Sequence, residues 1–192
     1  MKKKIIDSCI NLVNKYYDYD DIKTAELRYG LESLYMTITK MIVAIILSIF
    51  IGVTKELLLL SLFYGILRLV MFGAHGKNSI QCWIMSMLIF ILVPLLIKYS
   101  HVPKLIIIII FIFQFFLIYK YAPAGTEKRI LKNKKKKLVL KYASLFISTC
   151  YMFIITYFAN DYWSNILFYS LLLSTIFILP ITYKIMGVKY RY

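Results

Sequence analysis

Residues 79–99 read SIQCWIMSMLIFILVPLLIKY, and Lys98 is the only charged residue in this run. An apolar stretch of about 20 residues is long enough to cross the hydrocarbon core of a bilayer as a helix. Residues 75–78 before it are HGKN, and another apolar stretch precedes them. The solvent around this part of the chain is therefore expected to be lipid.

Similar runs recur along most of the 192 residues, which are 61% hydrophobic with a mean hydropathy of +0.73. Soluble domains are only about half apolar, so no soluble catalytic domain of ordinary size is expected. The sequence predicts an all-α fold, a polytopic membrane bundle of about six transmembrane helices. The predicted spans are 35–54, 56–72, 79–99, 102–121, 138–159 and 165–183.

Residues 1–40 are more polar and are predicted to form an amphipathic N-terminal segment, cytoplasmic or at the membrane interface, before a single transmembrane domain at 41–192. Ile6, Cys9 and Ile10 share one helical face, while Asp7 and Asn11 point elsewhere. Polar residues interrupt what would be the apolar core of a signal peptide, so the segment is expected to be retained. It either packs on the ends of the spans or binds a peptide.

Basic residues accumulate in short cytoplasmic loops of membrane proteins. With six spans, one face receives only Lys55, Lys98 and Lys104 of the 24 Lys and Arg residues. The sequence therefore predicts a multi-pass cell-membrane protein with both termini, the loop at 68–82 and the basic loop at 120–141 in the cytoplasm. We interpret the net charge of +15 as orientation and contact with anionic lipid, and no nucleic-acid partner is expected.

One stretch, 68–82, combines a base, a nucleophile and flexible backbone: RLVMFGAHGKNSIQC. In a straight helix His75 and Cys82 would lie about 10 Å apart along the axis, too far for proton transfer. Gly73 and Gly76 permit a turn, and Ser79 is a preferred helix N-cap. The pattern therefore predicts a helix, a turn and a second helix that brings the two side chains together.

If Ser79 is the cap, Cys82 lies in the first helical turn, where the helix dipole favours a thiolate that His75 can partner. The alternative is an ordinary interfacial histidine and an inert cysteine. Arg68 either bonds carbonyls of the loop, binds a substrate carboxylate or extends to the interface. Cys9 and Cys150 are expected to pack, and the sequence has no metal-binding motif, so neither a metal nor another cofactor is predicted.

Weaker candidates surround this pair. Ser79, Gln81 and Ser86 are near enough in sequence to orient His75 or hold an oxyanion, but ordinary helix-start or interhelical roles explain them equally well. Lys134, Lys135 and Lys136 belong to the basic run at 127–137. This run acts as a stop-transfer and lipid-contact signal, or as a surface for an acidic peptide.

These residues resemble the accessory gene regulator protein B (AgrB) family, the membrane cysteine endopeptidases of Gram-positive quorum sensing. The resemblance rests on Arg68, Gly73-Ala74-His75 and Cys82 with their spacing, and on Tyr121-Ala122-Pro123-Ala124 before a basic cluster. It implies that His75 and Cys82 are catalytic, and that the protein removes the C-terminal part of an AgrD-type propeptide. It also implies that the protein assists closure of a thiolactone ring.

Two other readings of the sequence stay open. In a peptide exporter or channel, Arg68 and His75 would line a path and Cys82 would be incidental. In a non-catalytic membrane scaffold, the N-terminal segment and the basic loop would recruit partners. A homodimer is expected, because a small bundle of six spans encloses little room for a peptide groove.

Overall fold

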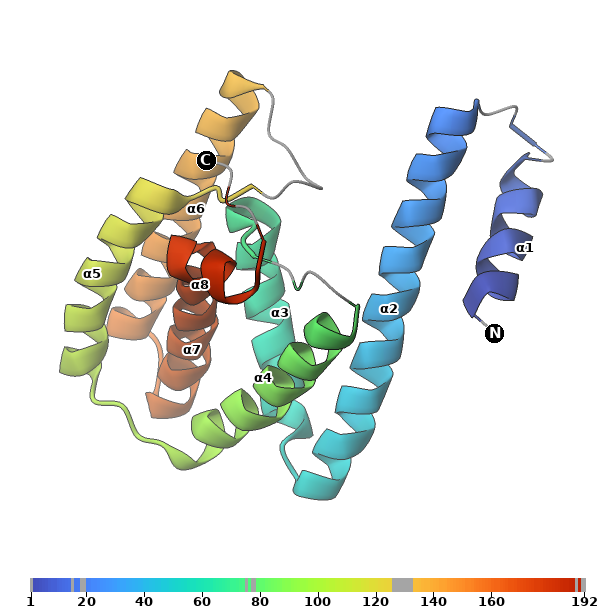
Figure 1. The fold of residues 1–192 in the computed structure, drawn as a ribbon. Coiled ribbons are helices and arrows are strands. Elements are labelled where there is room, and N and C mark those ends of the chain that lie inside the picture. Colours follow the sequence, from blue (N-terminus) through green and yellow to red (C-terminus); the bar gives the residue numbers. More distant parts are fainter. Residues whose placement is uncertain are drawn as a thin grey trace. The chain divides into compact units, whose positions relative to one another are not determined.

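The computed structural model describes residues 2–14, 16–17, 20–74, 76, 79–125, 133–188 and 190, in which regular structure consists of helices and one isolated β-bridge (Figure 1). The predicted all-α class is confirmed. The helices are α1 (Lys2–Asn14), α2 (Asp21–Ile51), α3 (Thr54–Met71), α4 (Ser79–Tyr99), α5 (Lys104–Tyr121), α6 (Lys134–Tyr157), α7 (Asp161–Ile178) and α8 (Pro180–Ile185).

Each predicted span overlaps one of the long helices α2 to α7. Among the described residues, α2, α4, α5 and α6 are long and apolar enough to cross a membrane. The helix α3 carries Lys55, Glu56 and Arg68, and α7 contains many small polar residues, so the count of six spans stays a prediction. The last predicted span is too long, because Pro180 holds Leu179 in an extended conformation and ends α7 at Ile178.

The chain divides within α2 into two compact units, residues 1–47 and 48–192. In the first unit, the carboxylate of Asp7 on α1 pairs with Arg28 on α2 at 2.8 Å, and Ile6 and Ile10 are buried. Cys9 is exposed, so the predicted packing of this cysteine is wrong. The predicted boundary at residue 40 stays a prediction.

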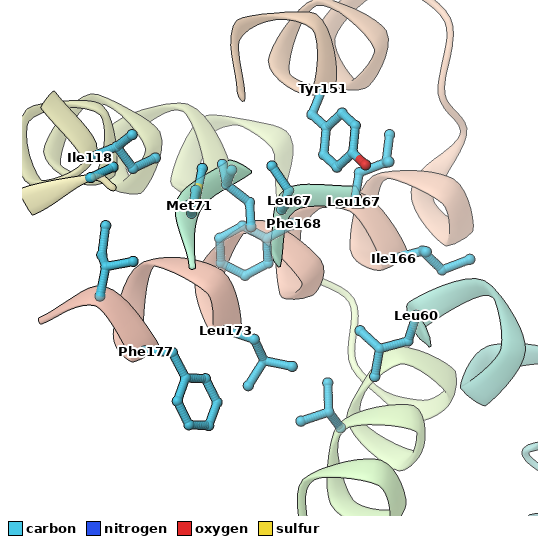
Figure 2. Packing of buried hydrophobic residues seen from close by; sticks show 14 of the residues in the cluster. Leu60, Leu67, Met71, Ile118, Tyr151, Ile166, Leu167, Phe168, Leu173 and Phe177 are labelled. Carbon is cyan, nitrogen blue, oxygen red and sulfur yellow. The ribbon is translucent and has the colours of Figure 1, made fainter. Parts of the chain in front are cut away.

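The second unit is built around α7, which contacts α3, α4, α5, α6 and α8. Figure 2 shows Leu167 and Phe168 of α7 beside Leu67 and Met71 of α3. The buried hydroxyl of Ser170 donates to a carbonyl one turn earlier in α7, at 2.7 Å, as do those of Ser174 and Thr175. Small residues satisfied in this way let helix backbones approach closely in a bundle.

Two lysines close the end of this unit where α2 meets α3 and α4 meets α5. Lys98 donates to the carbonyl of Gly52 at 2.7 Å, and Lys104 donates to the carbonyl of Ala159 at 2.8 Å. Cations bonded to the last carbonyls of a helix also complement its dipole. Residues 72–74, after α3, and 122–125, after α5, lie at the opposite end, since consecutive helices of the bundle run in opposite directions (Figure 1).

The core around α7 predicts a strong effect of truncating Leu67, which is 0% exposed. Leu67→Ala should lower the free energy of unfolding by about 2–5 kcal/mol, because it removes packing that the bundle cannot rebuild. Leu69→Ala, on the same helix but at a 69% exposed position, should change it by only about 0.5 kcal/mol. Denaturation of the detergent-solubilised protein measures both, and equal losses would contradict this packing.

Candidate functional site

The chain reverses direction immediately after α3. Phe72 has a φ of 57° and Gly73 a φ of 113°, and α4 then begins at Ser79. The predicted helix, turn and helix are therefore confirmed. Positive φ is costly for a residue such as Phe72, by about 1–3 kcal/mol, and persists only where surrounding contacts fix it. The contacts that fix this turn define the site.

Arg68 supplies the first of these contacts. Its guanidinium donates from Nη1 to the carbonyl of Phe72 and from Nη2 to the carbonyl of Ala74. The same group lies over the ring of Phe177, 5.1 Å from the ring centroid. Of the three roles left open by the sequence, the structure shows loop bonding, for which the planar fork of arginine is suited.

The segment after α5 supplies the second contact. Gly73 donates its N–H to the carbonyl of Ala124 at 3.1 Å, and Ala124 donates its N–H to the carbonyl of Met71 at 3.0 Å. These bonds make a parallel β-bridge between Phe72 and Ala124. The motif at 121–124 thus meets the turn directly, with a cis peptide bond between Ala122 and Pro123.

The end of α7 supplies the third contact. Ala74 donates its N–H to the carbonyl of Phe177 at 2.8 Å. The ring of Phe177 also packs against Tyr64, with centroids 6.4 Å apart. Three segments far apart in sequence therefore converge on residues 71–74.

Gly76 and Cys82 are in direct contact. A Cβ atom added to Gly76 would lie 2.7 Å from the backbone nitrogen of Cys82 and 2.8 Å from its Cα. Only a glycine permits the backbone to approach this closely. Cys82 is half-buried in the first turn of α4. His75 lies outside the described residues, but its neighbour Gly76 is held against the cysteine.

The structure describes Ser86, Gln81 and Ser79, the weaker candidates near Cys82, to different extents. Ser86 donates its hydroxyl to the carbonyl of Cys82 at 2.7 Å, the usual bond of a helical serine to the preceding turn. Gln81 is half-buried. Ser79 begins α4, while its side chain lies outside the described residues. An orienting or oxyanion-binding role for these three stays a prediction.

The basic candidates open α6. Asn133 caps this helix, accepting hydrogen bonds from the N–H groups of Lys135 at 2.9 Å and Lys136 at 3.4 Å. Lys134, Lys135 and Lys136 are all exposed. A capped, solvent-exposed first turn with three ammonium groups presents a fixed basic surface, which attracts anions. The rest of the predicted basic run, 127–132, lies outside the described residues.

Sequence reasoning missed two structural features of this end of the molecule, Tyr183 and the contact made by Ala124. The Tyr183 hydroxyl donates to the carbonyl of Ala124 at 2.9 Å. The motif at 121–124 indicated that this segment is important. A sequence motif does not show which residues the segment contacts. No group of three or more His, Cys, Asp or Glu residues in the described part of the chain is arranged to hold a metal ion.

Comparisons with known proteins assign a family. The family described as Accessory gene regulator B matches residues 6–178. A putative AgrB-like protein of Clostridium acetobutylicum is 31% identical over 93% of this chain and 86% of its own. Accessory gene regulator protein B of Staphylococcus aureus is 29% identical over 93% of this chain and 95% of its own. No solved structure matches.

The turn predicts that Gly73 tolerates no side chain. An added Cβ would meet the Arg68 guanidinium and lie 2.7 Å from the Phe177 carbonyl oxygen, at a φ of 113°. Gly73→Ala should therefore lower the free energy of unfolding by about 1–3 kcal/mol. Gly65→Ala is the matched control, since a Cβ there meets nothing within 4 Å and alanine favours the helix. Denaturation midpoints compare the two, and a Gly73→Ala protein as stable as wild type would refute this account of the turn.

Proposed function

The chain belongs to the accessory gene regulator B family, and from this premise we propose that it is a membrane-embedded cysteine endopeptidase acting on an AgrD-type propeptide. The family acts in accessory gene regulation, and the four long apolar helices are those of a membrane protein. On our proposal, the enzyme removes the C-terminal part of the propeptide through an acyl-enzyme on Cys82. It then assists closure of a thiolactone ring.

The observation that carries this proposal is the contact of Gly76 with the backbone of Cys82. In a straight helix the positions of His75 and Cys82 would be about 10 Å apart. The turn instead brings the residue after His75 against the first turn of α4. This supports a histidine and thiol pair within reach of proton transfer, which is the arrangement an activated cysteine nucleophile needs.

The first chemical step is acylation. The Cys82 thiolate attacks the carbonyl carbon of the scissile peptide bond, a C–S bond forms, and the C–N bond breaks as the leaving amine takes a proton from His75. Cys82 lies in the first turn of α4, where the unpaired backbone N–H groups of a helix start carry partial positive charge. The product is a thioester between Cys82 and the N-terminal part of the precursor.

The second step closes the ring. A cysteine thiolate within the precursor attacks the thioester carbonyl, a new C–S bond forms, and the Cys82 thiolate leaves. One thioester replaces another, so the exchange is nearly neutral in bond energy and requires only that water stay out. Residues 72–74 and 122–125 are buried, and a site with little water disfavours hydrolysis of the thioester.

Charge supports further parts of the proposal. The exposed first turn of α6 at Lys134–Lys136 suits the acidic tail of a precursor, and the surrounding basic residues suit an anionic lipid leaflet. We place both termini, the catalytic loop and this helix end in the cytoplasm, because the basic residues of short loops accumulate on the cytoplasmic side. The other end of the bundle, which carries Lys98 and Lys104, would then face the outside. We also propose a homodimer, in which two small bundles enclose the peptide.

The cysteine mechanism predicts that Cys82→Ala and His75→Ala each reduce cleavage by at least about a thousandfold. Cys150→Ala is the matched control, since this thiol lies in α6 away from the turn. The measurement is mass spectrometry of a cognate precursor incubated with the protein in nanodiscs. An acyl adduct on Cys82 is expected in the wild type and absent from both variants. Cleavage that survives Cys82→Ala would exclude Cys82 as the nucleophile, whereas an intact precursor bound by the wild type and both variants would instead favour an exporter or a scaffold.

The basic turn of α6 predicts a binding effect. Replacing Lys134, Lys135 and Lys136 by Gln should raise KM for a precursor with an acidic tail and leave kcat nearly unchanged. Added salt should weaken wild-type binding more than binding by the variant. Replacing Lys2, Lys3 and Lys4 by Gln removes the same charge elsewhere and is the control. Equal KM values for the two triple variants would exclude a specific role for α6.

A further inference from the structure

Tyr183 is a side chain outside the proposed catalytic pair whose hydroxyl reaches the network that holds the turn. It lies in α8 and is 1% exposed. Its hydroxyl donates to the carbonyl of Ala124 at 2.9 Å, and the same oxygen accepts the N–H of Gly73 at 3.1 Å. One carbonyl oxygen therefore joins α8, the segment after α5 and the turn after α3.

We propose that Tyr183 is a positioning residue for the thiol chemistry, acting through the Ala124 carbonyl on the turn that carries His75. This inference rests on the proposed function of His75 and Cys82. Tyr183 acts indirectly, since its hydroxyl bonds the carbonyl of Ala124. Its effect is to fix the direction of the Ala124 carbonyl, and with it the Gly73 peptide two residues before His75.

The turn depends on such side-chain and backbone bonds because it lies between two helices and has no ladder of its own. Arg68 fixes the carbonyls of Phe72 and Ala74, and Phe177 accepts the N–H of Ala74. Ala124 is a further support, and among the described residues the side chain of Tyr183 bonds its carbonyl. A displacement of about 1 Å at a catalytic group is enough to reduce a rate strongly.

A second tyrosine supports the first. The ring of Tyr190 meets that of Tyr183 edge to face, with centroids 4.9 Å apart and an interplanar angle of 90°. The Tyr190 hydroxyl donates to the carbonyl of Tyr121 at 3.3 Å, immediately before the motif. The last described residues of the chain thus hold both ends of the segment at 121–124. On this proposal, Tyr183 and Tyr190 hold the segment that supports the turn, in addition to packing in the bundle.

The test compares Tyr183→Phe with Tyr151→Phe in the full chain in nanodiscs. Tyr151 is 6% exposed, and its hydroxyl donates to the carbonyl of Phe63 at 3.0 Å, away from the turn. Each change removes one hydroxyl and one bond to a backbone carbonyl. The first readout is the pH profile of Cys82 alkylation by iodoacetamide, followed at the level of the cysteine-containing peptide so that Cys9 and Cys150 do not interfere. The second is the thermal unfolding midpoint.

Tyr183→Phe should slow alkylation of Cys82 at neutral pH by about fivefold and move its profile to higher pH, because the histidine partner is less well held. Tyr151→Phe should leave the profile unchanged although it lowers the unfolding midpoint to a similar extent. With the cognate precursor, Tyr183→Phe should lower kcat and leave KM unchanged. An unchanged alkylation profile in Tyr183→Phe, or an equal shift in both variants, would overturn the inference.

These outcomes are distinguishable from a failure of the proposed function. Alkylation reports the state of the Cys82 thiol without any peptide, so the comparison stands even if the wild-type protein leaves the precursor intact. An intact cognate precursor would overturn the peptidase. A shifted alkylation profile in Tyr183→Phe alone would still establish that this hydroxyl positions the turn.

Discussion

The peptide groups of residues 71–74 must be hydrogen-bonded at the end of a membrane bundle, where little water is available to replace a missing partner. Helices satisfy this requirement internally, but a turn does not. Here Arg68, Ala124 and Phe177 supply the partners from three separate segments. The rest of the site depends on this arrangement, because the same turn places Gly76 against Cys82.

This requirement connects the core of the bundle to the site. The helix α7 is rich in buried small polar residues and packs at the centre of the second unit, so its last turn reaches the turn after α3. There the Phe177 carbonyl accepts a bond from the turn and the Phe177 ring supports Arg68. Packing of α7 against α3 therefore fixes the position of the turn relative to Phe177 and also stabilises the fold.

The charges divide along the same axis. Lys98 and Lys104 at one end are bonded to carbonyls just after the ends of α2 and α6, those of Gly52 and Ala159, and so close that end of the bundle. Lysines at the start of α6 are exposed beyond an asparagine cap, and so remain available to an anionic partner. A peptide with an acidic tail and an apolar, amphipathic portion would meet lipid, basic surface and thiol at one end of the molecule.

The sequence by itself determined the helical class, the positions of six long helices and the turn before Cys82, because apolar runs and glycines act over short distances along the chain. It also indicated that Arg68 and the motif at 121–124 matter. Only the tertiary structure decided that Arg68 bonds the turn and does not simply extend to the interface, that Ala124 forms a bridge with Phe72, and that Tyr183 holds Ala124. The contacts of Ala124 with Phe72 and with Tyr183 join residues 52 and 59 positions apart in the chain, and no local periodicity or spacing specifies which distant group a residue will meet.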